Sequence, residues 1–343
     1  MLTFVTPEQA LHAPADEFFR GQRVPCLENP TRARFVEDAL RAHGHALRPP
    51  TVDSAPLLAQ ARAALPRFLR GAWDEWLALD AANAQLQPFP SVWPVRTLRS
   101  DVEPANFVAR LGLYSMDNGS PMAAGTWSAA KAAADAAASA AQALLAGERA
   151  VFCATRPPGH HAGPDFMGGY CFINNAAVAA QALRNGGAAR VALLDVDYHH
   201  GNGTQAIFYE RADVLFASIH GDPRTEYPFY LGHADETGAG AGQGFNLNLP
   251  LPAGSTAAVW FDALEHALAR IARHGADALV VSLGLDTFAG DPISTFQLQA
   301  DDFTRLGQRL AQAGLPTAFI LEGGYAAAEL GHNAAQVLQG FES

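Results

Sequence analysis

The sequence predicts an α/β fold: a single domain with a mainly parallel central sheet and helices on both faces. Short runs of apolar residues recur along the chain, and each run is bounded by turn-forming residues. The runs are continuous rather than alternating, which is typical of strands buried on both faces of a parallel sheet. Helical patterns lie between the runs, and this alternation of strand and helix indicates a layered α/β architecture.

Composition supports one large globular domain. Of the 343 residues, 49% are hydrophobic and 17% are charged, so the chain can bury a large core and is not disordered. This length also suits two domains, but no shift in composition and no internal repeat marks a boundary. We therefore expect a single domain over residues 1–343.

The expected strands share continuous apolar character, and they are residues 150–154, 191–194, 214–218, 278–283 and 317–321. The expected helices share a helical apolar period, and they are residues 57–79, 126–146, 175–185, 204–210, 257–274 and 301–313. Lys131, Asp135 and Gln142 interrupt the Ala-rich helix, which is therefore expected to be a soluble one. Residues 96–125 are long for a connection, and they are expected to be either a functional loop or a flexible surface loop.

The charge balance limits the partners. The chain has 23 Lys and Arg against 34 Asp and Glu, a net charge of −11, and Lys131 is its single lysine. This balance argues against binding to nucleic acid and against a polybasic membrane anchor. An acidic surface suits a cationic substrate, but it is also common among soluble proteins that bind none.

The cysteines and the absence of long apolar stretches indicate a cytoplasmic protein. Cys26, Cys153 and Cys171 are odd in number and far apart, so neither a disulfide framework nor a thiolate zinc site is expected. No signal-peptide pattern and no apolar stretch long enough to cross a bilayer is present in the sequence.

Polar side chains collect directly after four of the expected strands, and such strand ends meet at one crevice in open α/β sheets. Asp197 and His199 lie two residues apart, so in an extended stretch both side chains point the same way. Asp286 follows a different strand and can supply a third ligand. Two carboxylates and one imidazole leave a coordination position open, which is typical of catalytic zinc, and iron(II) accepts the same set.

Further side chains at these strand ends suit general-base catalysis and the stabilisation of an oxyanion. His160 and His161 lie where a general base is needed, and the ordinary pKa of histidine is near neutrality. Asp195 can orient one of the two imidazoles, and Asn202 can hold the other. Tyr325 follows a strand and two glycines, so its hydroxyl can donate a hydrogen bond to a developing oxyanion.

A site with two metal ions is less favoured than a site with one. A second ion needs further carboxylates beside the first ligands. Gly201 stands two residues after His199, and Phe288 stands two residues after Asp286, so neither position can bridge two ions. We therefore expect a single metal ion.

Six ordered motifs between about residues 126 and 325 resemble those of the zinc-dependent histone deacetylase and acetylpolyamine amidohydrolase family, within the arginase and deacetylase superfamily. They are Arg156-Pro-Pro-Gly-His-His-Ala-Gly, Gly168-Gly-Tyr-Cys-Phe-Ile-Asn-Asn, Asp195-Val-Asp-Tyr-His-His-Gly-Asn-Gly-Thr, Ser218-Ile-His-Gly-Asp, Ser282-Leu-Gly-Leu-Asp and Glu322-Gly-Gly-Tyr. The chain length and residues 96–125 resemble bacterial acetylpolyamine amidohydrolases, in which such a loop narrows the site and helps to form a dimer. The resemblance implies the arginase/deacetylase fold, a homodimer, and residues 96–125 at the site mouth and dimer interface.

The resemblance also implies a role for each site residue. The zinc ligands would be Asp197, His199 and Asp286. His161 would be the general base and acid, and His160 would be its electrostatic partner, linked to Asp195. Tyr325 would polarise the substrate carbonyl, and Tyr170 and Tyr227 would flank a narrow channel. A structural potassium or sodium ion would be held by Asp195, Asp197, His199, Ser218 and Ile219, partly through backbone carbonyls.

One position departs from part of the family. Some members have aspartate where this chain has Asn202, so the partner of His161 is neutral here. A neutral partner gives less support to the basicity of that imidazole.

These roles imply hydrolysis of an acetylated amine to acetate and a free primary amine. The first expected substrates are small acetylated polyamines such as N-acetylputrescine and N-acetylcadaverine. Glu17, Glu103 and Asp117 lie in regions resembling the polyamine-recognising parts of the family, where a carboxylate can hold a distal ammonium group, although exposed acidic residues are often simply solvated. Two alternatives remain open: a deacetylase of acetyl-lysine in proteins or peptides, and a catalytically silent protein that binds acyl-amines.

Overall fold

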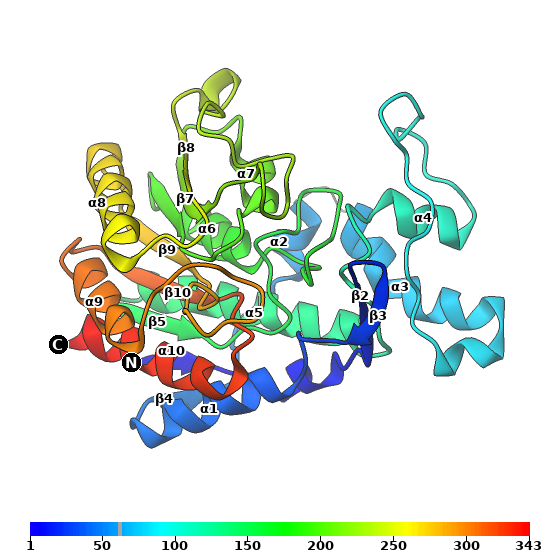
Figure 1. The fold of residues 1–343 in the computed structure, drawn as a ribbon, viewed down its shortest axis with the longest axis horizontal. Helices are drawn as coiled ribbons and strands as arrows, with labels where there is room; N and C mark the ends of the chain where they lie inside the picture. The colour runs from blue at the N-terminus through cyan, green and yellow to red at the C-terminus, as the bar shows by residue number, and fades with distance from the viewer. Residues whose placement is uncertain (61–63) are drawn as a thin grey trace.

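An eight-stranded sheet lies at the centre of the computed structural model, which describes residues 1–60 and 64–343 (Figure 1). The strand order is β4-β1-β5-β10-β9-β6-β7-β8, and every neighbouring pair is parallel. The strands are β1 (Leu2–Phe4), β4 (Ala46–Arg48), β5 (Ala150–Cys153), β6 (Val191–Asp195), β7 (Val214–Gly221), β8 (Asn246–Leu251), β9 (Ala278–Leu283) and β10 (Thr317–Leu321). A separate antiparallel pair joins β2 (Asp16–Phe19) and β3 (Gln22–Pro25).

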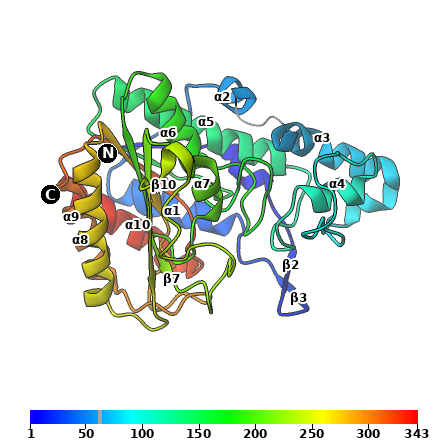
Figure 2. The same cartoon turned by 90° about the horizontal axis from the view of Figure 1, so that it is seen from above.

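Helices cover both faces of the sheet, as the sequence predicts (Figure 2). The helices are α1 (Thr31–Ala42), α2 (Ala55–Gln60), α3 (Ala64–Leu79), α4 (Phe107–Leu113), α5 (Thr126–Leu145), α6 (Asn175–Asn185), α7 (Asn202–Phe208), α8 (Ala257–His274), α9 (Ala300–Ala311) and α10 (Ala327–Glu342). One core packs against α5 and α6, and a second core packs against α1, α8, α9 and α10. Neighbouring residues of a strand serve opposite cores: Val151 belongs to the first and Phe152 to the second.

The five strands expected from apolar runs are all present, because their side chains are buried on both faces of the sheet. The sequence reasoning missed β1, β4 and β8. β1 and β4 have three residues each, too few to show a period, and β8 is an edge strand in which Asn and Leu alternate. Helices α1 and α10 were missed as well.

The helix expected over residues 57–79 is present as α2 and α3 where the chain is described, and residues 61–63 lie outside the described residues. The helix expected over residues 204–210 begins earlier, at Asn202, and ends at Phe208. In the part of the chain that is described, no helix is long and apolar enough to cross a membrane.

The expectation that residues 96–125 form a continuous loop is wrong, because the segment contains α4. The side chain of Asn106 caps this helix by accepting a hydrogen bond from the Ala109 N–H at 3.2 Å. Phe107 and Leu111 lie four residues apart and are both buried in the core. The residues between α3 and α4 extend away from the sheet (Figures 1 and 2), whereas the chain after α4 returns to it, since Met122 is buried in the core.

Candidate active site

The carboxyl ends of four adjacent strands bring the predicted site residues together. Asp195 is the last residue of β6, and it stands opposite Ser282 of β9 and Ser218 of β7. The chain after β6 carries Asp197 and His199, and the chain after β9 carries Asp286. Since parallel strands end at the same edge, side chains distant in the sequence meet in one crevice.

The three predicted metal ligands converge. One ligand atom each from Asp197, His199 and Asp286 lies within 4.8 Å of the other two. The His199 Nδ1 atom lies 3.1 Å from Asp286 Oδ2 and 3.4 Å from Asp197 Oδ1. The second oxygen of each carboxylate is held by a backbone hydrogen bond. Asp286 Oδ1 accepts a hydrogen bond from the Tyr198 N–H at 2.8 Å, and Asp197 Oδ2 accepts one from the Gly323 N–H at 2.9 Å.

The charges and the space around Asp197, His199 and Asp286, here called the triad, suit a bound cation. Burial and the neighbouring Asp197 carboxylate raise the pKa of Asp286 to about 7, because two negative groups share a site removed from water. A Cβ atom on Gly323 would lie 2.6 Å from Asp197 Oδ2 and 2.8 Å from Asp286 Oδ2, so only glycine leaves both carboxylates room. Two carboxylates and one imidazole form a donor set suited to a catalytic divalent metal ion.

The two histidines after β5 differ in charge. Burial opposes a charge on His160, but the carboxylates of Asp197 and Asp195 raise its pKa to about 10. The His160 Nδ1 atom lies 3.0 Å from Asp195 Oδ2. By contrast, burial and the positive charge of His160 hold the pKa of His161 well below its ordinary value. At neutral pH, therefore, His160 is cationic and His161 is neutral.

Asn202 sets the tautomer of His161. The His161 Nδ1 atom lies 2.6 Å from the Asn202 Oδ1 atom, and the Asn202 Nδ2 atom points to the Met116 sulfur at 3.1 Å. With the amide oxygen facing the ring, Nδ1 carries the hydrogen and donates it to Asn202. The Nε2 atom then keeps a free lone pair, which a general base requires.

Tyr325 is partly buried beside the triad. The guanidinium of Arg32 lies 4.9 Å from the centre of its ring, and the Tyr170 ring centre lies 5.4 Å away. Burial holds the pKa of the Tyr325 hydroxyl well above its ordinary value. The phenol therefore stays protonated and can donate a hydrogen bond.

Tyr170 and Tyr227, predicted to flank a channel, lie close to the catalytic groups. The Tyr227 ring centre is 5.0 Å from that of His161. The Tyr227 hydroxyl donates a hydrogen bond to Asp117 Oδ2 at 2.6 Å, and the same oxygen accepts from the Gly169 N–H at 3.1 Å. Asp117 thus reaches this region from the segment between α4 and α5.

Two of the three predicted acidic recognition residues lie near the channel, and the third is engaged elsewhere. Glu17, on β2, is buried and shares a hydrogen bond with Tyr170, and burial raises its pKa. Glu103 Oε2 accepts from Arg67 at 2.9 Å and from the Tyr114 hydroxyl at 3.1 Å. These contacts tie Glu103 to α3 and to the residue after α4, so the structure gives it no contact with the channel residues described here.

The predicted monovalent-cation residues lie on β6 and β7 and in the chain just after β6. Asp195 pairs in register with Ser218, and Ile219 is the next, fully buried residue of β7. The Ser218 Oγ atom lies 2.8 Å from His220 Nδ1. This part of the site stays a prediction.

Sequence reasoning missed two groups that hold the backbone at His160 and at the turn before Tyr325. Glu322 is fully buried, and it accepts hydrogen bonds from the N–H groups of Gly159 at 2.6 Å and His160 at 3.1 Å. Arg32, on α1, donates to the carbonyl oxygens of Glu322 and Gly324. The motif around Tyr325 contains Glu322 and could have drawn attention to it, whereas no local pattern marks Arg32.

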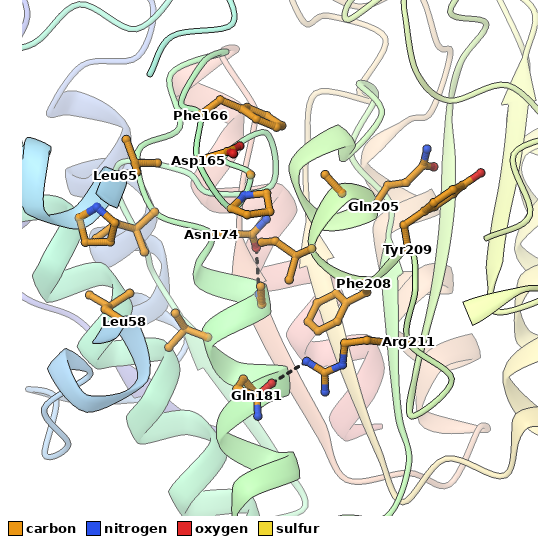
Figure 3. A pocket seen from close by; sticks show the side chains of 18 of the residues that line it. Leu58, Leu65, Asp165, Phe166, Asn174, Gln181, Gln205, Phe208, Tyr209 and Arg211 are labelled. Atoms are coloured by element: carbon orange, nitrogen blue, oxygen red, sulfur yellow. Dashed lines mark hydrogen bonds between the residues drawn. The ribbon is translucent and has the colours of Figure 1, made fainter. Parts of the chain in front are cut away.

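A separate cavity of about 940 Å³ lies between α2 and α3 on one side and α6 and α7 on the other (Figure 3). Leu58 and Leu65 face Phe208 across it, and most of its lining is apolar. The predicted metal ligands and the two histidines after β5 do not line this cavity. Its size is typical of ligand pockets, but the convergence of titratable groups with shifted pKa values marks the strand-end crevice as the candidate active site.

Comparison with known proteins finds similar chains along the whole length of this one. The family model of the histone deacetylase domain matches residues 28–341. The chain is 52% identical to acetylpolyamine amidohydrolase 2 of Pseudomonas aeruginosa, over 100% of this chain and 99% of the relative. It is 43% identical to the acetylpolyamine amidohydrolase of Mycoplana ramosa, over 99% of each chain.

A solved structure shares the whole fold. The acetylpolyamine aminohydrolase of Burkholderia pseudomallei superimposes with a TM-score of 0.92 and 41% sequence identity, covering 100% of this chain and 99% of that one. The family resemblance and the arginase/deacetylase fold predicted from the sequence motifs are thus confirmed. The chain belongs to the histone deacetylase domain family.

Proposed function

We propose that this protein is a metal-dependent amidohydrolase that removes the acetyl group from acetylated polyamines and releases acetate and a free primary amine. Its full-length relatives carry the name acetylpolyamine amidohydrolase, and they are 41–52% identical to it. The observation that carries the proposal is the convergence of Asp197, His199 and Asp286 beside a neutral His161 and a protonated Tyr325.

Asp197, His199 and Asp286 would hold the metal ion, which we propose to be zinc, with iron(II) as the other candidate. When bound, the ion lowers the pKa of water and polarises the acetyl carbonyl. The Nε2 atom of His161 takes a proton from the attacking water and later delivers one to the departing amine. Tyr325 donates a hydrogen bond to the oxyanion.

His160 has an electrostatic role in this scheme. It lies 3.0 Å from Asp195 and 3.8 Å from Asp197, so it is a fixed cation between two carboxylates. Its ring centre lies 3.9 Å from that of His161. A positive neighbour at this distance disfavours a second charge, and so it keeps His161 neutral until the proton transfer.

The structural potassium or sodium ion would be held by Asp195, Asp197, His199, Ser218 and Ile219.

We assign the recognition of the distal ammonium group to Glu17 and Asp117. Glu17 is 3% exposed and has a raised pKa, so an incoming cation would stabilise its ionised form. Asp117 is tied to the predicted channel because its carboxylate accepts a hydrogen bond from the Tyr227 hydroxyl. A net charge of −11 also favours a cationic substrate over a neutral one.

The experiment that tests the function compares substrates on one metal-loaded preparation. Release of amine from N-acetylputrescine and N-acetylcadaverine should exceed release from an acetyl-lysine peptide. Preference for the peptide would move the function to protein deacetylation with the same chemistry. No release from any acetylated amine would leave the silent acyl-amine-binding protein as the remaining candidate.

The Glu17→Gln variant tests the recognition of the ammonium group. It should raise KM for N-acetylputrescine and leave KM for a neutral N-alkylacetamide unchanged.

We also propose that the protein is a cytoplasmic homodimer, formed through the segment between α3 and α5 that includes residues 96–125. Val92, Val95, Leu98 and Val102 are each more than 55% exposed in this segment, which is unusual for a run of large apolar side chains. Light scattering should give a dimer mass for the wild type and a monomer mass for a Val95→Asp/Leu98→Asp double variant. The Val259→Asp variant, at an exposed position on α8, should stay dimeric.

A further inference from the structure

The turn that carries Tyr325 is held from several sides. Gly324 has φ of +126°, a left-handed value that favours glycine and allows the chain to turn between β10 and α10. The Gly323 N–H donates to Asp197 Oδ2, and its carbonyl accepts from the Leu285 N–H at 3.0 Å. Arg32 donates to the carbonyl oxygen of Gly324 at 2.7 Å. These hydrogen bonds hold the turn up to Gly324, and Arg32 and Tyr170 contact the Tyr325 ring, but none of these contacts holds the Tyr325 backbone.

Asp291 supplies hydrogen bonds to the backbone at Tyr325. Its Oδ2 atom accepts hydrogen bonds from the N–H groups of Tyr325 at 2.6 Å and Ala326 at 3.1 Å. Its Oδ1 atom accepts from the Ile293 N–H at 3.1 Å. The side chain is 7% exposed, so water does not compete freely for these bonds.

Helix α10 explains why a carboxylate is needed at this place. The helix begins directly after Ala326, a residue whose side chain cannot cap it. Free N–H groups and the positive end of the helix dipole lie at this N-terminus, and a negative group stabilises both. Asp291 provides that group from the segment between β9 and α9, five residues after the predicted metal ligand Asp286.

We propose that Asp291 is a positioning residue for the hydrolysis, one that fixes the Tyr325 hydroxyl at the substrate carbonyl. This inference rests on the role of Tyr325 in the proposed function. Arg32 donates to carbonyl oxygens of the turn, and Asp291 accepts from N–H groups of the turn, so the backbone around Tyr325 is held from two sides. Asp291 thereby joins the turn of Tyr325 to the segment that carries the predicted metal ligand Asp286. Displacements of about 1 Å in such groups lower rates strongly.

The Asp291→Asn variant tests this role. Asparagine has the shape of aspartate but only one acceptor oxygen. Its NH₂ group, a donor, must therefore face the N–H donor of either Ile293 or Tyr325, and one hydrogen bond is lost. We expect kcat for N-acetylputrescine to fall about tenfold, with KM and bound metal close to wild type. Amide hydrogen exchange of Tyr325 and Ala326 in the metal-free protein should become faster. Asp302→Asn is the matched control, since Asp302 caps α9 in a similar way by accepting from the Gln299 N–H at 2.8 Å, and kcat should not change.

A double-mutant cycle separates positioning from general destabilisation. If Asp291 acts through the Tyr325 hydroxyl, adding Asp291→Asn to Tyr325→Phe should slow the enzyme by less than twofold further. A full tenfold loss in the Tyr325→Phe background would overturn the inference, as would wild-type kcat in Asp291→Asn alone. A wild-type protein that hydrolyses no acetylated amine, or a Tyr325→Phe variant with full activity, would instead contradict the proposed function. Amide exchange needs no turnover, so it tests the inference even in a protein without activity. Unchanged exchange of Tyr325 and Ala326 in Asp291→Asn would overturn the inference.

Discussion

The His161 Nδ1 atom lies 2.6 Å from the Asn202 side-chain oxygen, so the predicted general base is oriented by a neutral group. A carboxylate in this place would favour the imidazolium form, whereas an amide orients the ring without adding charge. His160 differs, because its partner is the carboxylate of Asp195 at 3.0 Å. The two adjacent histidines differ in charge because carboxylates raise the pKa of His160, whereas burial and the charge of His160 lower that of His161.

Replacing Asn202 by aspartate should raise the pKa of His161. The base acts in its neutral form, so activity is lost as the pH falls through this pKa, and a higher pKa moves the acidic limb of the kcat/KM profile to higher pH. The measurement is that profile for N-acetylputrescine in both proteins. Asn185→Asp, at the distant end of α6, adds the same charge and should leave the limb in place. An unshifted limb in Asn202→Asp would show that His161 is not the titrating base.

Replacing Tyr325 by phenylalanine should lower kcat about a hundredfold, since one oxyanion donor is lost. The ring and its contact with Arg32 are retained, so the thermal midpoint and metal content should stay close to wild type. Steady-state kinetics and elemental analysis of the same sample measure both. Near wild-type turnover would mean that another group stabilises the oxyanion.

Replacing His199 by alanine should abolish metal binding. The two remaining carboxylates lose the imidazole that lies 3.1 Å from Asp286 and 3.4 Å from Asp197. Metal content after dialysis against a weak chelator should drop to near zero by elemental analysis. The exposed His266 on α8 provides the control, because its alanine variant should bind a full equivalent. A full metal content in His199→Ala would disprove this ligand assignment.

Acid should destabilise the protein through His12. Burial lowers the pKa of this histidine to about 4 from an ordinary value of 6.5, although Glu28 lies nearby. Between pH 6.5 and pH 4 the unfolded chain therefore binds more protons than the folded chain, so the free energy of unfolding falls as the pH falls. From pH 7 to pH 5 this group accounts for a loss of about 2 kcal/mol.

Urea unfolding of the metal-free protein at the two pH values measures this loss. The His12→Asn variant keeps a polar group near Thr126 Oγ1, which lies 2.9 Å from His12 Nδ1, but cannot titrate. Its stability should therefore fall by about 2 kcal/mol less than that of the wild type over the same interval. The exposed His332→Asn variant should behave as wild type. An identical pH dependence in His12→Asn and wild type would show that His12 does not titrate in this range.

The sequence by itself determined the fold class, because strands buried on both faces require continuous apolar runs wherever they occur. It also located the candidate metal ligands, since Asp197 and His199 share one short motif and Asp286 stands directly after another apolar strand. Short and edge strands such as β1 and β8 were not predictable, because three residues or an alternating pattern carry too little hydrophobic signal.

Only the tertiary structure decided which groups support the site. Asp291 and Arg32 hold the turn of Tyr325 through backbone N–H and carbonyl groups, and no local sequence pattern marks either residue. Glu17 and Glu103 look alike in the sequence, yet one is buried beside Tyr170 and the other is paired with Arg67. The charge state of His161 likewise depends on burial and on His160, and these are set by how distant segments pack.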